Sequence, residues 1–100
     1  MGKLDGGEMS DDIEEIKAMI ADANEEALLA DGFDGALIGF VEIPGKLVAL
    51  YDKEKCIEIL MLRDGMSYEG AYDFFEFNVR DAFVGEGTPA FATILRKSAH

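Results

Sequence analysis

Asp31 and Asp34 are the residues whose type and spacing best suit catalysis or cation binding. Two nearby carboxylates can act as acid and base in catalysis, or supply oxygen ligands to a cation. Each is followed by a glycine, however, and aspartate before glycine is typical of turns in which the carboxylate accepts backbone N–H bonds. We therefore expect consecutive turns here. A small carboxylate-dependent enzyme stays as the second alternative, and it predicts a carboxylate-lined pocket at residues 31–39.

Other reactive residue types are scarce and poorly placed for catalysis. The spacing from Asp31 to Glu42 matches the ends of an EF-hand calcium loop, but Ala36 stands where that loop needs glycine. His100, the single histidine, is the last residue, and Cys56 lies in a run of apolar residues typical of a core. We predict no catalytic residue, no cofactor and no metal ion.

The composition indicates one folded, soluble domain. The chain has 100 residues, of which 49% are hydrophobic, which is too apolar for intrinsic disorder. No apolar run approaches the ~20 residues of a membrane span, so no membrane partner is expected. The first ten residues lack the features of a signal peptide, and one cysteine cannot form an internal disulfide. A cytoplasmic location is expected.

Acidic residues dominate the charge of the chain. The formal net charge is −12, and residues 1–34 hold eleven of the twenty-one acidic side chains. Such a surface repels phosphate backbones, so direct binding to nucleic acid is not expected. The same charge supports an alternative function, in which an acidic ridge mimics nucleic acid and inhibits a host enzyme by occupying its channel.

Residues 1–9 are expected to be a flexible lead-in, and residues 10–97 a single α+β domain. Ser10 is a good N-cap for a helix over residues 11–23. A short apolar run predicts a strand at 26–30. Residues 36–42 and 47–51 flank a Pro-Gly turn and predict a hairpin.

The second half of the chain predicts two helices and a last strand. Asp52 and Ser67 are suited to cap helices at 53–63 and from 68 onward, and residues 90–95 read as a strand. The predicted order is αβββααβ, with an antiparallel sheet packed against helices that include an αα-hairpin. Both hairpin strands are apolar on alternate and on intervening positions, which predicts helices on one face of the sheet and a different cover on the other.

Seven of the ten aromatic residues lie between residues 67 and 91. At 100° per residue, one arc of the third helix forms a predicted core face. Its members are Tyr68, Ala71, Tyr72, Phe75, Val79, Ala82 and Phe83. Phe74 lies outside this arc, and Phe77 lies on the far side of the helix with Asp73 and Asp81.

The third helix therefore carries more aromatic surface than one of its faces can bury, and Phe74 and Phe77 are the excess. Either another part of the chain covers them, or they form an intermolecular contact together with Asp73 and Asp81. The second case predicts a homodimer or a protein partner, and a non-enzymatic interaction or regulatory domain. A DNA-reading helix is not expected, because acidic residues outnumber Arg80 on the outward side.

The segments DGFDGALIG (31–39) and FFEFNV followed by VGEGTP (74–79 and 84–89) resemble a family of small proteins from bacteriophages and bacteria. The resemblance covers about the last three-quarters of the chain. That family has no assigned function, so the resemblance implies no activity and no catalytic residue. It implies a phage-related or mobile-element setting.

Overall fold

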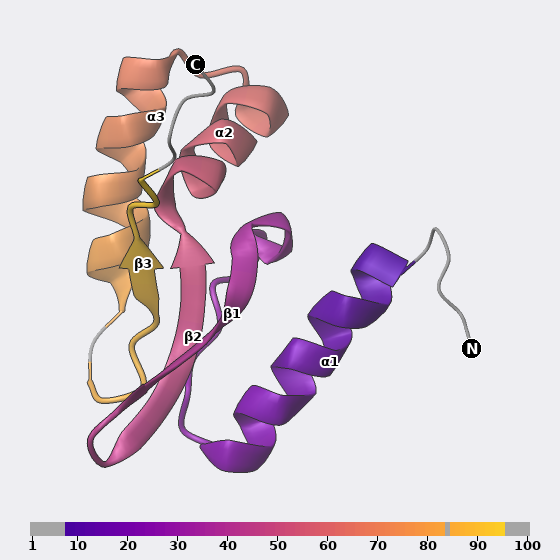
Figure 1. Cartoon of the computed structure of the whole chain (residues 1–100). Helices are drawn as coiled ribbons and strands as arrows, with labels where there is room; N and C mark the ends of the chain where they lie inside the picture. The colour runs from indigo at the N-terminus through magenta and orange to yellow at the C-terminus, as the bar shows by residue number, and fades with distance from the viewer. Residues whose placement is uncertain (1–7, 84, 96–100) are drawn as a thin grey trace.

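The computed structural model describes residues 8–83 and 85–95, and within them the chain forms a small α+β domain with a three-stranded sheet (Figure 1). Its helices and strands are α1 Glu8–Ala23, β1 Leu37–Ile43, β2 Lys46–Asp52, α2 Lys53–Asp64, α3 Tyr68–Phe74 and β3 Ala90–Ala92. The π-helix η2, Phe75–Val79, and the 3-10 helix η3, Arg80–Ala82, continue α3, and a 3-10 turn, η1 Asp34–Ala36, precedes β1.

The predicted hairpin is confirmed. Strands β1 and β2 pair antiparallel, with Ile43 opposite Lys46 and Val41 opposite Val48. The turn between them contains Pro44 and Gly45, and Gly45 has a φ of 89°, a conformation that favours glycine because it has no Cβ. The hairpin is thus encoded locally by its turn and its β-branched strands.

The prediction of an antiparallel sheet is wrong for the last strand. β3 pairs with β2 in parallel, with Phe91 opposite Tyr51, so the sheet is mixed, in the order β1-β2-β3. The chain between β2 and β3 passes through α2 and α3, as Figure 1 shows. A helical crossover returns the chain to the end of the sheet where it started, so the next strand runs in the same direction.

The strand predicted at 26–30 does not form, and this changes the predicted element order. Residues 27–30 have irregular backbone. Their amides find other partners, because the Leu28 N–H donates to the Gly87 carbonyl at 2.9 Å and the Ala30 N–H donates to the Tyr51 hydroxyl at 2.8 Å. The Asn24 side chain also donates to the Leu47 carbonyl at 2.9 Å. These bonds satisfy the backbone without a strand ladder.

Helix α1 begins earlier than predicted, at Glu8, so Ser10 lies inside it and does not cap it. Residues 1–7 of the predicted lead-in lie outside the described residues. Figure 1 shows α1 as the indigo helix beside the hairpin. Ile20 is buried in the core, and Lys17 binds Asp34 of η1 at 2.8 Å. This hydrogen bond raises the pKa of Lys17 above its ordinary value.

Two of the three predicted helix caps, those of α2 and α3, are confirmed. The Asp52 carboxylate accepts from the Lys55 N–H at 3.3 Å, and the Ser67 hydroxyl accepts from the Gly70 N–H at 3.1 Å. Gly65 ends α2 with a left-handed φ of 71°. The caps fix where α2 stops and α3 begins, and so build the αα-hairpin.

The core lies between the helices and one face of the sheet. It joins α1, the sheet, α2 and the extended α3 through one cluster of buried side chains that includes Ile20, Tyr51, Ile57, Leu60 and Phe75. Among the described helices, none combines the length and the apolarity needed to cross a bilayer.

Candidate interaction surface

Two aromatic and two acidic side chains lie exposed along α3 and its extensions. Phe77 is 71% exposed and Phe74 is 38% exposed, while Asp73 and Asp81 are also exposed. Residues three or four apart are neighbours on a helix surface, so these four form one strip, which we call the aromatic strip. The described part of the chain leaves Phe77 largely uncovered.

The π-helix η2 contains both buried and exposed side chains of this segment. In η2, Phe75 and Val79 point into the core, whereas Phe77 and Asn78 are exposed. Each residue in a π-turn advances less around the axis than in an α-helix, because the hydrogen bonds join residues five apart. An α-helical advance of 100° per residue would also separate Phe77 from Phe75 and Val79, so the π-turn preserves this division.

The predicted core face is wrong for three of its members. Tyr68, Tyr72 and Ala82 are exposed, while Ala71, Phe75 and Val79 are buried and Phe83 packs against the core. The two tyrosines lie at the seam with α2, where the Tyr68 hydroxyl donates to Glu54 at 3.3 Å. A tyrosine accommodates this place because its ring packs while its hydroxyl reaches a polar partner.

A charged network fixes the aromatic strip to the rest of the domain. Glu76 binds Lys53 of α2 at 2.8 Å and Arg80 of η3 at 2.7 Å. The Lys53 ammonium also lies 4.7 Å from the centre of the Tyr72 ring. The side chains of Lys53 and Glu76 are only 15% and 18% exposed, so this pair is better shielded from solvent than an ordinary surface pair.

The network predicts a stability that depends on pH. The hydrogen bond from Lys53 lowers the pKa of Glu76 below its ordinary value of 4.5. The stabilisation is therefore present above the pKa of the unfolded chain and is lost as the pH falls through the folded pKa. Between about pH 6 and pH 3, the free energy of unfolding should fall less in Glu76→Gln than in the parent. Urea denaturation at each pH measures this difference.

A paired variant controls this prediction. In a Lys53→Met background, Glu76→Gln should have a smaller effect on the pH dependence, because only the Arg80 partner is left. Parallel curves of unfolding free energy against pH for the parent and Glu76→Gln would contradict the assignment.

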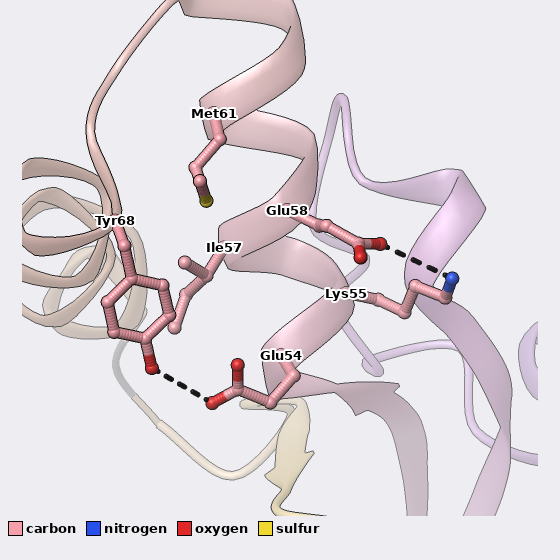
Figure 2. A pocket seen from close by; sticks show the side chains of 6 residues that line it. All are labelled: Glu54, Lys55, Ile57, Glu58, Met61 and Tyr68. Atoms are coloured by element: carbon pink, nitrogen blue, oxygen red, sulfur yellow. Dashed lines mark hydrogen bonds and ion pairs between the residues drawn. The ribbon is translucent and has the colours of Figure 1, made fainter.

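A hollow at the seam of α2 and α3 contains two carboxylates. Figure 2 shows Glu54, Lys55, Glu58 and Tyr68 around it, with Glu58 bound to Lys55 at 3.3 Å. Ile57 and Met61 supply its apolar side. Its volume is about 240 Å³, below the ~300 Å³ at which small-molecule sites begin. These polar groups are bonded in two pairs, Tyr68 with Glu54 and Lys55 with Glu58.

The structure separates the roles of Asp31 and Asp34. Asp34 is bound to Lys17, whereas exposed Asp31 borders an apolar hollow of about 220 Å³ that is also lined by Phe33 and Phe83. The pocket that the enzyme alternative predicts at residues 31–39 thus contains one carboxylate of the pair. In residues 8–83 and 85–95, no group of three His, Cys, Asp or Glu side chains is placed to hold a metal ion.

Cys56 is fully buried, as its place in an apolar run predicts. Burial raises the pKa of its thiol to about 12, so the reactive thiolate is scarce at neutral pH. His100 lies outside the described residues. The structure thus gives the cysteine a packing role.

Comparison with protein-family models, with curated proteins and with solved structures found no match. The resemblance to phage and bacterial proteins therefore stays a prediction.

Proposed function

We propose that this chain is a non-enzymatic protein-binding domain, of phage or mobile-element origin, that acts through the aromatic strip. The observation that carries the proposal is the 71% exposure of Phe77 in a segment fixed by the ion pairs of Glu76. An exposed aromatic side chain on a fixed backbone loses little entropy on binding, and Phe and Tyr are enriched in the centres of protein interfaces.

The chemistry of the strip defines the partner. Phe74 and Phe77 require an apolar pocket, and the flanking Asp73 and Asp81 favour Lys or Arg at its rim. A net charge of −12 accelerates association with such a basic surface and makes the rate depend on salt. The proposed partner is therefore a protein with an apolar groove that has Lys or Arg at its rim. This domain binds in that groove as a regulatory subunit.

The test compares three forms of the domain as bait in a lysate of the source organism. Phe77→Ser removes the central aromatic ring, and Leu62→Ser is the matched control, because Leu62 is 83% exposed on α2 and outside the strip. One protein should be captured by the parent and the control but lost with Phe77→Ser. Its purified form should bind the Phe77→Ser variant at least about 30-fold more weakly, the effect of losing a hot-spot side chain.

Binding to the purified partner, measured at two salt concentrations, tests the contribution of Asp73 and Asp81. Asp73→Asn with Asp81→Asn should slow association at low salt and change dissociation little. Equal capture by the parent and Phe77→Ser would overturn the proposal, since Leu62→Ser already controls for the loss of an exposed apolar side chain.

Exposed carboxylates favour the nucleic-acid mimic as a second candidate. Glu14, Glu15 and Asp22 are exposed on α1, and Glu25 and Glu26 follow at its end. In this case the partner is a nucleic-acid enzyme, and Phe77→Ser would leave binding intact while Glu15→Gln with Asp22→Asn would weaken it. The two candidates are thus distinguished by which variant loses the partner.

A further inference from the structure

Strand β1 is an edge of the sheet. The strand order is β1-β2-β3, so in the described chain β2 pairs with one side of β1 and no strand pairs with the other. Figure 1 shows this open side turned away from β3 and α3. β1 has seven residues, whereas the strand at the opposite edge, β3, has three. Short length, lysine and proline commonly protect an edge from a further strand, and β1 has none of these features.

The hydrogen bonds of the hairpin decide which backbone groups of β1 point to the open side. The first and last residues of a four-residue turn are joined by a hydrogen bond, so Ile43 and Lys46 form a bonded pair across the Pro-Gly turn. Bonded and non-bonded pairs alternate along an antiparallel ladder. Glu42, opposite Leu47, is therefore in a non-bonded pair, and so is Phe40 two residues away. The N–H and C=O groups of these two residues of β1 point away from β2.

The bond made by Leu47 agrees with this pattern. Its carbonyl accepts from the Asn24 side chain at 2.9 Å, as expected for a group that points away from β1. On β1 itself, the two outward N–H groups have no hydrogen-bond partner among residues 8–83 and 85–95. The side chains along this strand are accessible, since Ile38 is 46% exposed and Ile43 is 41% exposed. The edge is thus open to an added strand.

A hollow between α1 and β1 lies beside this edge and has both apolar and acidic walls. Its volume is about 370 Å³, and it is lined by Met19, Asp22, Ala23, Phe40, Glu42 and Leu47. Met19 is 50% exposed, so apolar surface is accessible there. Asp22 and Glu42 are exposed, and neither forms an ion pair with another residue of the described chain.

The hollow defines the side chains that an added strand would carry. Successive side chains of a strand point to opposite faces, so every second residue of an added strand faces the hollow. Lysine suits these positions, because its stem packs on apolar surface such as Met19 while its ammonium reaches a carboxylate. Apolar residues suit the intervening positions, where they continue the surface of Val41 and Ile43.

We propose that the edge of β1 binds an extended basic segment of a protein partner, which joins the three-stranded sheet as a further strand. Phe40 and Glu42 each contribute one N–H and one C=O to the new ladder, and the side chains of the segment supply specificity. The register shift between Leu37 and Gly39 limits regular pairing to residues 39–43. A second copy of this chain fits the edge poorly, because a net charge of −12 repels it.

This inference does not depend on the aromatic strip. The strip continues α3 and packs on β3 through the ring contact of Phe75 with Phe91, whereas β1 lies at the other edge of the sheet. The two surfaces can therefore be tested separately.

The test measures hydrogen exchange of the Phe40 and Glu42 amides by NMR, with and without a seven-residue peptide of alternating valine and lysine. The peptide should slow exchange at these two amides. Two control peptides examine its chemistry. One has glutamate in place of every lysine, and the other is N-methylated throughout, so that it keeps the side chains but has no N–H to donate. Neither control should slow the exchange.

Two substitutions at one position separate the backbone contribution from the charge. Glu42→Pro removes the outward N–H but retains the ladder with β2, since proline is tolerated in an edge strand at such a position. It should weaken peptide binding at least about tenfold, the effect of losing one hydrogen-bond donor. Glu42→Gln keeps the N–H and should weaken binding only about threefold. Circular dichroism checks folding, and if Glu42→Pro does not fold, the N-methylated peptide decides the question with the parent protein.

Each outcome supports or overturns the proposal. Slower exchange with the lysine peptide alone, reduced by Glu42→Pro, supports it. No effect of the lysine peptide, or an equal effect of either control peptide, would overturn it. Slow exchange of the two amides in the protein alone would also overturn it, because another part of the chain, or a second copy at high protein concentration, would then cover the edge. Phe77→Ser should leave peptide binding unchanged, so this inference and the proposed function can fail separately.

Discussion

Phe75→Ala is expected to lower the free energy of unfolding by about 3–5 kcal/mol, the range for removal of a buried phenylalanine side chain. Phe75 is 0% exposed. Its ring meets Phe91 of β3 edge to face, with centroids 5.1 Å apart and planes at 85°. Removing it leaves a cavity between η2 and the sheet and exposes the ring contacts of Phe91. Small domains have about 5–15 kcal/mol of stability in total, so the variant should be partly unfolded at 37 °C.

The neighbouring phenylalanine supplies the control. Phe77→Ala makes the same chemical change two residues along the helix, but at a side chain that is 71% exposed. Its effect on stability should stay within about 0.5 kcal/mol. Urea denaturation followed by circular dichroism suits both variants, since the chain has no tryptophan. Similar losses of stability in the two variants would show that this segment does not divide core from surface as described.

Gly87→Ala is expected to destabilise the domain by about 1–3 kcal/mol, the usual effect of overpacking a closely packed site. A Cβ at Gly87 would collide with the backbone carbonyl of Glu26. The Leu28 N–H donates to the Gly87 carbonyl at 2.9 Å, so the loop before β3 and the segment after α1 are held together as backbones. The extra methyl group must push them apart and break this bond.

Hydrogen exchange gives this prediction a local signature. The Leu28 amide should lose protection in Gly87→Ala before the amides of the β1–β2 hairpin do. Gly35→Ala is the matched control, because a Cβ there lies 3.6 Å from the Ile59 side chain, an ordinary contact. Its effect should stay within about 0.5 kcal/mol. Unchanged Leu28 protection in Gly87→Ala would contradict the close approach.

The candidate surface was partly predictable from the helical period. A uniform 100° per residue separates Phe74 and Phe77 from Phe75 and Val79, and the structure exposes the first two and buries the others. The same period places Tyr68 and Tyr72 in the core, but the structure shows both side chains exposed. Their polar hydroxyls were the available signal, because each finds a partner on α2. The period cannot show where α2 will lie.

The two faces of the hairpin also had a signal in the sequence. Apolar residues at both alternate and intervening positions of the hairpin predict two covered faces, and the structure places helices on one. Val48 lies on the second face by alternation and is nevertheless only 2% exposed.

The sequence by itself determined the elements whose signals are local. Asp52 and Ser67 cap helices by accepting from amides three positions away, and the Pro-Gly turn brings adjacent strands together. Only the tertiary structure decided the parallel direction of β3, the irregular backbone at 27–30 and the exposure of the aromatic strip. The Tyr51 hydroxyl that binds the Ala30 amide is 21 positions away. Contacts at such separations depend on how whole elements pack, which no local pattern specifies.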